Sequence, residues 1–134
     1  MLVVDDDAET REVMAVTLGR EGAVVTTAPS VGEAVAVIER GWPDVLLSEI
    51  RMPGEDGYDL IRKVRHLEAI GGRHLPAIAL TGYAAADDRR RVLDAGFEAH
   101  VPKPVPAAEM APIIVSLLER GARPPAGRRG DLPT

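Results

Sequence analysis

The sequence predicts a doubly wound α/β fold, in which a parallel β-sheet carries helices on both faces. Short runs of Val, Leu, Ile and Ala alternate with segments of helical periodicity, which is the pattern of repeated βα units. A chain of 134 residues is long enough for one hydrophobic core and too short for two ordinary domains. Four of the apolar runs also end in polar residues, and doubly wound sheets hold their sites at the carboxyl ends of the strands.

Five strands are expected, at residues 2–4, 23–26, 45–48, 77–80 and 99–101. Helices are expected at 8–20, between Ser30 and Gly41, after the loop 52–57 up to Gly71-Gly72, at about 84–95, and from near Pro106 onward. Ser30 and Glu33 have the spacing of a capping box. The right-handed crossover rule arranges the strands in the flavodoxin-like order 2-1-3-4-5.

The first and last helices are expected to bury one apolar face each. The first face comprises Val13, Met14, Thr17 and Leu18; the last comprises Met110, Ile113, Ile114, Leu117 and Leu118. The tail 121–134 is rich in Pro, Gly and Arg and lacks an apolar stripe. It is predicted to be disordered, so the domain occupies residues 1–120.

Composition excludes several classes of protein. There is no cysteine, which excludes disulfides and thiolate metal sites. No apolar run approaches the ~20 residues of a membrane span. The start of the chain lacks the basic segment of a signal peptide, and a cytoplasmic location is expected. The net charge of -5, which is more negative still without the basic tail, argues against direct nucleic-acid binding.

Chemistry gathers at the predicted strand ends. Asp5-Asp6-Asp7 follows the first strand, Glu49 the third, Thr81 the fourth and Lys103 the fifth. Adjacent carboxylates repel one another unless a cation compensates, so Asp5, Asp6 and Glu49 are candidate ligands of a hard metal ion. Taken singly, each has a simpler explanation: Asp at a helix start, Thr as a helix cap and Lys as a solvated loop residue.

The three histidines, His66, His74 and His100, lack metal-ligand spacing. His100 lies on the fifth strand near Lys103. Its ring either moves between an inner and an outer position or is an ordinary histidine at the edge of the sheet.

Together these residues resemble the receiver domain of two-component response regulators. The resemblance covers about residues 1–120 and rests on six motifs in order, namely Val-Asp-Asp-Asp at 4–7, Pro-Asp-Val-Leu-Leu at 43–47, Met-Pro-Gly-Glu-Asp-Gly-Tyr at 52–58, Ala-Leu-Thr-Gly-Tyr-Ala at 79–84, Ala-Gly-Phe at 95–97 and Pro-Lys-Pro at 102–104. The resemblance implies a phosphorelay function through protein–protein contacts. Its partners would be a histidine kinase or phosphotransfer protein, a downstream protein or output domain, and a second copy of the chain as an option.

The resemblance also implies roles for single residues. Asp6 resembles a direct Mg²⁺ ligand, Asp5 a ligand acting mainly through water, and Arg51 the position whose backbone carbonyl binds the metal. Thr81 resembles the switch hydroxyl and His100 the rotating switch ring. Lys103 resembles the lysine that pairs with the acceptor or with its phosphate.

Glu49 departs from the family pattern, because the phosphoacceptor position is normally aspartate. The extra methylene displaces the nucleophilic oxygen by roughly 1 Å, which can cost on the order of a hundredfold in rate. The carboxylate could also act as a partial phosphate mimic by engaging Thr81 and Lys103. Impaired phosphotransfer is therefore expected, and the chain itself is not expected to be an enzyme beyond a receiver's autophosphorylation.

Two other functions remain open. A degenerate receiver could serve as a constitutive docking module, although retention of Asp5, Asp6, Thr81 and Lys103 favours a switching receiver. A phosphohydrolase of the haloacid-dehalogenase type also combines strand-end carboxylates with Thr and Lys. That family requires D-x-D-G-T after its first strand, and Asp5-Asp6-Asp7-Ala8-Glu9 does not supply it.

Overall fold

The computed structural model describes residues 1–71, 73–81, 86–103 and 107–122. Strands and helices alternate along these residues, as β1 (Leu2–Val4), α1 (Ala8–Arg20), β2 (Thr26–Ala28), α2 (Val31–Arg40), β3 (Leu46–Glu49), α3 (Gly57–Ala69), β4 (Ala77–Thr81), α4 (Ala86–Ala95), β5 (Ala99–Pro102) and α5 (Ala107–Ala122). All four strand pairings are parallel, and the order is β2-β1-β3-β4-β5. The predicted fold class and strand order are confirmed.

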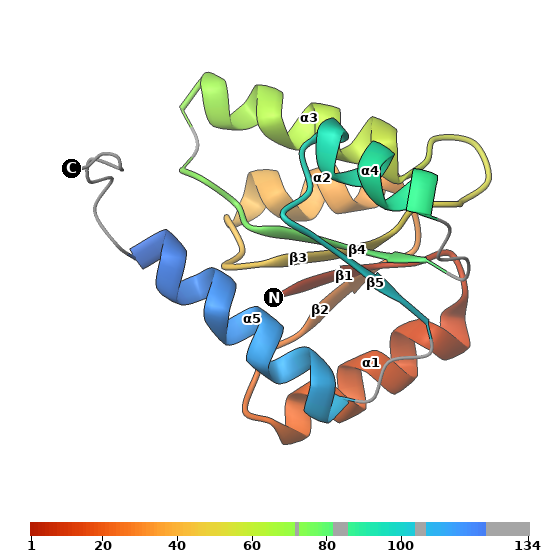
Figure 1. Ribbon diagram of the computed structural model, residues 1–134, viewed down its shortest axis with the longest axis vertical. Helices are drawn as coiled ribbons and strands as arrows, with labels where there is room; N and C mark the ends of the chain where they lie inside the picture. The colour runs from red at the N-terminus through yellow and green to blue at the C-terminus, as the bar shows by residue number, and fades with distance from the viewer. Residues whose placement is uncertain (72, 82–85, 104–106, 123–134) are drawn as a thin grey trace.

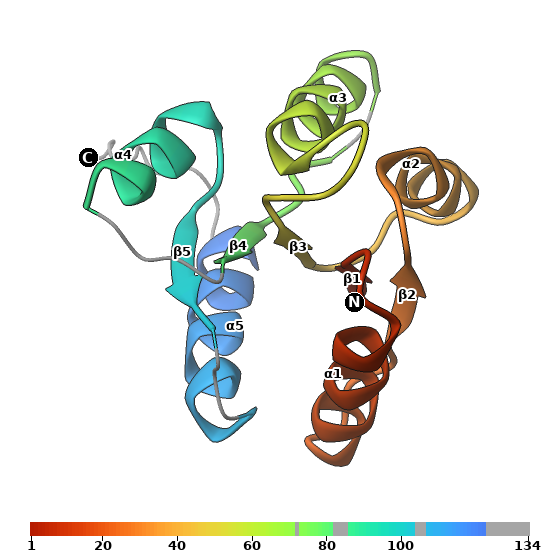
Figure 2. The same cartoon turned by 90° about the vertical axis from the view of Figure 1, so that its right-hand side faces the viewer.

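The sheet forms the middle of three layers (Figure 1). Helices α1 and α5 cover one face, and α2, α3 and α4 cover the other, as the view along the sheet in Figure 2 shows. A separate hydrophobic cluster lies between the sheet and the helices on each of its two faces. The side chains of β3 and β4 are buried throughout, as expected for central strands that are covered on both faces.

The second strand lies later in the chain than predicted. It begins at Thr26 rather than at residue 23, because it pairs only with β1, whose first residue, Leu2, is opposite Thr26. Residues 23–25 therefore precede the first available partner. The extent of β2 is therefore set by the length of β1 and not by the hydrophobic pattern of residues 23–26.

Two residues expected in the core are exposed. Val13 of α1 is 54% exposed. Met14 and Leu18 pack this helix against the sheet, and Val13 points away from that contact because neighbouring residues of a helix are turned by about 100°. Leu118 of α5 is 37% exposed for the same reason, since the buried stripe there contains Met110, Ile114 and Leu117. The two helices therefore present apolar side chains to solvent.

The last helix continues slightly beyond the predicted domain end. α5 runs to Ala122, so residues 121 and 122 are helical rather than part of a tail. The predicted disorder of the remaining tail concerns residues 123–134, which lie outside the described residues. Within the described part of the chain, no helix is long and apolar enough to cross a membrane.

Gly57 fixes the position of α3 against the end of β3. Its N–H donates to the carbonyl oxygen of Ile50 at 2.8 Å. A Cβ at this position would lie 2.7 Å from the carbonyl oxygen of Glu49 and 2.8 Å from Cα of Ile50, which is closer than real Cβ contacts. Only glycine therefore permits this approach, which places the start of α3 directly beside the residue that ends β3.

An ion-pair network ties α3 to β4 and β5 at the opposite end of the sheet. The Arg65 guanidinium donates to the carbonyl oxygens of Gly96 at 2.7 Å and Leu75 at 2.8 Å. It also pairs with Glu98 at 2.9 Å and with Glu68. Glu98 in turn accepts from the N–H of Ala77 at 2.9 Å. A half-buried charge is thus satisfied by fixed partners, far from the strand ends that carry the candidate site.

Candidate functional site

The parallel register brings the chemically active residues to one edge of the sheet. Val4 is opposite Ser48, and Glu49 is opposite Leu80, so the residues that end β1, β3 and β4 lie side by side. Asp5, Glu49 and Thr81 are buried there, with exposures of 2%, 8% and 5%.

Lys103 joins this group from the residue after β5. Its backbone N–H donates to the carbonyl oxygen of Thr81 at 2.7 Å, which ties the lysine to the end of β4.

Its ammonium lies between two buried carboxylates. Nζ is 2.7 Å from Oδ2 of Asp5 and 2.7 Å from Oε1 of Glu49. This contact connects the ends of β1, β3 and β5. The contact between Lys103 and Glu49, which the resemblance led us to expect, is present in the structure.

Glu49 has both carboxylate oxygens engaged. Oε1 faces Lys103, while Oε2 accepts from the backbone N–H groups of Ile50 at 2.7 Å and Arg51 at 3.2 Å. The carboxylate therefore turns back on its own main chain. Charge-assisted hydrogen bonds of this kind are stronger than neutral ones and hold the side chain in one orientation.

Asp5 is held in the same manner. Oδ1 accepts from the N–H of Asp7 at 2.9 Å, and Oδ2 accepts from Lys103. Arg11 of α1 donates to the backbone carbonyl of Asp5 at 2.7 Å, which brings a second positive charge close to the acidic run. Asp7 serves as the N-cap of α1, since its side chain accepts from the N–H of Thr10 at 3.3 Å. Only Asp6 of the three aspartates is neither buried nor used as a cap.

The environment of Lys103 keeps it charged. Burial by itself would lower its pKa, but the hydrogen bonds and negative charges of Asp5 and Glu49 outweigh burial, so the pKa of Lys103 is raised above its ordinary value. The ammonium is therefore a fixed positive charge at neutral pH, and it compensates part of the negative charge of the site.

The site suits a hard cation in donor type, since carboxylate and carbonyl oxygens are what Mg²⁺ prefers. Among the described residues, however, no three acidic or histidine side chains gather as a metal-ligand set. Asp6 is exposed, and the facing oxygens of Asp5 and Glu49 share the ammonium of Lys103. The four residues named as ligands, including the Arg51 carbonyl, therefore remain a prediction.

The Thr81 hydroxyl is paired with the ring of His100. Oγ1 of Thr81 and Nε2 of His100 are 2.8 Å apart, on adjacent strands β4 and β5. The two residues assigned to switching are therefore in direct contact. Glu49 makes its described contacts with Lys103 and the backbone, and its predicted contact with Thr81 is not among them.

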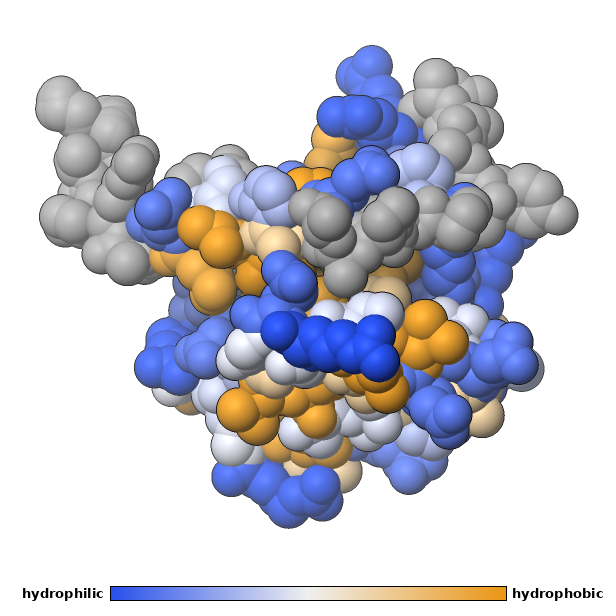
Figure 3. Space-filling model, turned by 90° about the horizontal axis from the view of Figure 1, so that it is seen from below, coloured by the Kyte–Doolittle hydropathy of each residue, from blue (hydrophilic) through white to orange (hydrophobic). Residues whose placement is uncertain are grey.

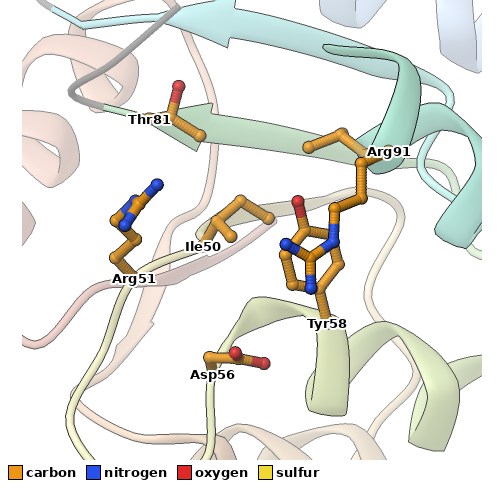
Figure 4. A pocket seen from close by; sticks show the side chains of 7 residues that line it. Ile50, Arg51, Asp56, Tyr58, Thr81 and Arg91 are labelled. Carbon is orange, nitrogen blue, oxygen red and sulfur yellow. The ribbon is translucent and has the colours of Figure 1, made fainter. Parts of the chain in front are cut away.

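A pocket of about 140 Å³ opens beside Thr81 on the side of α4 (Figure 4). Its lining includes Arg51, Asp56 and, from α4, Arg91. The Arg91 guanidinium lies 4.5 Å from the centroid of the Tyr58 ring, a cation–π contact that joins α4 to α3. The Arg51 side chain lines this pocket. The predicted metal-binding role of Arg51 belongs to its backbone carbonyl and does not involve this side chain.

The sequence match decides the family. A family model with the description "Response regulator receiver domain" matches residues 1–115 of the chain. The chain belongs to the response regulator receiver domain family. Receiver domains act in two-component phosphorelay signalling, and they are generally not catalytic apart from their own phosphorylation. The family that the sequence motifs indicated is therefore confirmed.

The relatives of this receiver domain differ in size. An uncharacterized 14.6 kDa protein in the sodA1 3′ region of Leptolyngbya boryana is 45% identical over 85% of this chain and 86% of its own length. Hybrid signal transduction histidine kinase D of Dictyostelium discoideum is 36% identical over 90% of this chain but only 8% of its own length. The chain thus spans nearly all of the first relative and a small part of the kinase.

A solved structure confirms the fold of the receiver domain. The receiver domain protein (CheY-like) from Methanospirillum hungatei JF-1 is 30% identical, with a TM-score of 0.79 over 90% of this chain and 93% of the other. The CheY-like flavodoxin fold is therefore shown at the level of the whole domain.

The structure gathers most of the predicted site residues and adds others. Asp5, Glu49 and Lys103 form one cluster, and Thr81 and His100 form an adjacent pair. Sequence reasoning missed Arg11, Gly57 and the Tyr58–Arg91 contact. The close approach at Gly57 is visible only in the structure, since a glycine in a loop sequence has many ordinary explanations. Arg11 and Arg91 looked like ordinary surface residues of a helix.

Proposed function

We propose that this receiver domain relays signals through protein–protein contacts and that Glu49, at the phosphoacceptor position, impairs phosphotransfer from a histidine kinase. The observation that carries the proposal is the engagement of both Glu49 oxygens. A nucleophilic carboxylate must present an oxygen to the incoming phosphorus, in line with the leaving nitrogen of the phosphohistidine. One oxygen of Glu49 faces an ammonium and the other faces two backbone N–H groups.

The length of the side chain adds to this effect. The additional methylene displaces the oxygen by roughly 1 Å, a misplacement that can cost on the order of a hundredfold in rate. As a phosphate mimic Glu49 is incomplete, because it contacts Lys103 but its described contacts do not include Thr81. A single carboxylate also carries less charge than a phosphate. The proposal is therefore a silenced acceptor with at most a partial shift toward an active state.

Mg²⁺ is proposed to bind weakly near Asp5, Asp6 and Glu49, with the Arg51 carbonyl as a further ligand and several waters retained. When bound, the ion would offset negative charge at the acceptor. The melting temperature should rise with millimolar Mg²⁺ in the wild type and rise less in Asp6→Ala. Equal indifference of both proteins to Mg²⁺ would remove the metal from the proposal.

The alternative function is a degenerate receiver that docks a partner constitutively in the cytoplasm. The Thr81–His100 hydrogen bond favours this docking module over a receiver in which Glu49 mimics the phosphate, because Thr81 and His100 already bond to each other without Glu49. The receiver hypothesis is preferred because the remaining residues of the site are intact and in contact. Its partner would be a histidine kinase or a phosphotransfer protein, by analogy with the hybrid kinase to which the chain is similar.

The proposal is tested with a small acyl phosphate and Mg²⁺, scored by intact mass. We expect little or no phosphoryl gain for the wild type, gain for Glu49→Asp, and none for Glu49→Asn, the matched variant without a nucleophile. Lys103→Ala in the Glu49→Asp background should weaken the response to phosphorylation.

The possible outcomes separate the two functions. If Glu49→Asp stays unmodified while another receiver is labelled under the same conditions, the site is inactive for a different reason and the docking module becomes the better explanation. A phosphoryl gain by the wild type would show the reach argument to be wrong.

A further inference from the structure

One face of helix α1 is exposed although it carries two large apolar side chains. Val13 is 54% exposed and Val16 is 48% exposed. They share this face with Glu12, Gly19 and Arg20, all of which are exposed. At 100° per residue these five positions lie within about one third of the helix circumference, so they form a single continuous surface.

The charges on this face are ordered along the helix. Glu12 lies toward the N-terminal end, the valines are in the middle, and Arg20 is the last residue of α1. None of the ion pairs among the described residues involves Glu12 or Arg20. The face is thus acidic at one end, apolar in the middle and basic at the other end, and neither charge forms an ion pair with another described residue.

Such a surface is complementary to itself when one copy is reversed. We propose that the α1 face binds the α1 face of a second copy of this chain, with the two helices antiparallel about a two-fold axis. A two-fold interface brings the same patch from both partners together, so that residue i contacts j and residue j contacts i. With the axis at Val16, Glu12 of each copy lies opposite Arg20 of the other, and Val16 packs against its own counterpart.

Gly19 completes the fit. In this register Val13 of one copy lies opposite Gly19 of the other. A Cβ built on Gly19 would meet nothing within 4 Å, so the surface there is open. The glycine thus provides a shallow recess for the exposed valine, and its small size lets the two helix backbones approach closely.

Helix α5 also carries exposed apolar side chains. Helices α1 and α5 lie on the same face of the sheet and are in contact (Figure 1). On α5, Val115 is 52% exposed and Leu118 is 37% exposed. Figure 3, which views this side of the molecule, shows hydrophobic side chains interspersed with hydrophilic ones. Exposed apolar side chains therefore occur on both helices that cover this face of the sheet.

A second copy suits this face because reversing one helix places each charge opposite a charge of the other sign. The interface is small, so the association is expected to be weak and must be measured at concentrations up to about 1 mM. This inference does not depend on the chemistry of Glu49.

The first experiment measures the mass of the intact chain by sedimentation equilibrium over a range of concentrations. The wild type should show a monomer–dimer equilibrium. Val16→Glu should abolish dimerisation, because two carboxylates would face each other across the axis. Ile70→Glu is the matched control: Ile70 is 68% exposed at the end of α3, on the other side of the sheet, so the same change in charge there should leave the equilibrium intact.

The second experiment exchanges the charges. Glu12→Arg alone and Arg20→Glu alone each place like charges opposite one another twice per dimer, and each should weaken association by about tenfold. The double variant Glu12→Arg/Arg20→Glu should dimerise as the wild type does. Mixing the two single variants should produce a heterodimer in which both charge pairs are again opposite in sign, even though neither variant dimerises well alone.

Thermal melting of each variant checks that the monomer is folded. A wild type that stays monomeric at every concentration overturns the proposal, as does a wild type that uses this face only to bind a helical partner of another sequence. Failure of the double variant and of the mixture to restore association, with folded monomers, overturns the antiparallel register.

Discussion

Replacing Lys103 by methionine should strongly destabilise the domain. The ammonium is 2.7 Å from both Asp5 and Glu49, whose side chains are only 3% and 10% exposed, while that of Lys103 is 25% exposed. Methionine keeps most of the volume but leaves two carboxylates facing each other without a cation. Removal of one partner from a buried ion pair costs about 3–5 kcal/mol. Allowing for the partial exposure of the lysine, we expect about 3 kcal/mol, or a fall of about 1–2 M in the urea midpoint.

The assay is urea unfolding at pH 7, with Lys63→Met as the matched control. Lys63 pairs with Glu55 at 2.6 Å, but these side chains are 46% and 50% exposed. The control should therefore lose less than about 1 kcal/mol. Because the pKa of Lys103 is raised on folding, its contribution is fully present below the unfolded value near 10.5 and is lost only as the pH rises through the higher folded value. Equal losses in the two variants would refute the reasoning.

Three further variants test how the chain supports the site and the fold. Gly57→Ala should cost about 1–3 kcal/mol in urea unfolding and shift the backbone amide resonance of Glu49, because the new Cβ would lie 2.7 Å from that residue's carbonyl oxygen. Arg65→Met should cost about 1–3 kcal/mol in the same assay, since the carbonyl oxygens of Gly96 and Leu75 and the partly buried carboxylate of Glu98 each lose a donor. The pKa of Asp59 is lowered, first by the hydrogen bond from the N–H of Asp56, so its contribution is present above the unfolded value of about 3.8 and is lost as the pH falls through the lower folded value. Asp59→Asn should therefore lose less stability than the wild type between pH 5 and pH 2, measured by thermal melting.

The sequence was a good guide to the fold because its strongest signals are local. A strand such as 77–80 reads as a continuous apolar run. Ser30 marks the start of α2, and the structure confirms the N-cap half of the predicted capping box with a bond from the N–H of Glu33, while the reciprocal bond from the Glu33 side chain is not among the described bonds. The second strand was misplaced because its extent depends on β1, which pairs with it from another part of the chain. The exposure of Val13 was likewise missed, since a pattern of apolar residues cannot distinguish a face that meets the sheet from one that meets solvent.

At the site, residue types could be predicted and orientations could not. Polar residues directly after strands meet at one edge of a parallel sheet, which is why Asp5, Glu49 and Lys103 were grouped correctly. The second oxygen of Glu49 accepts from the backbone N–H groups of Ile50 and Arg51, which depends on how the chain bends after β3 and not on residue type. The Tyr58–Arg91 contact depends on the mutual placement of α3 and α4, which no local pattern records.

The hydrogen bond between Thr81 and His100 has a polarity, and the ring determines it. When Nε2 carries a hydrogen, the ring donates and the threonine hydrogen points elsewhere; when Nε2 is bare, the hydroxyl donates into the ring. A hydroxyl has one hydrogen, so in the second arrangement that hydrogen is engaged by the ring and is not available to another acceptor. A histidine at position 100 therefore determines, through the hydrogen on Nε2, which way the threonine hydroxyl points, and a phenylalanine at the same position could not do so.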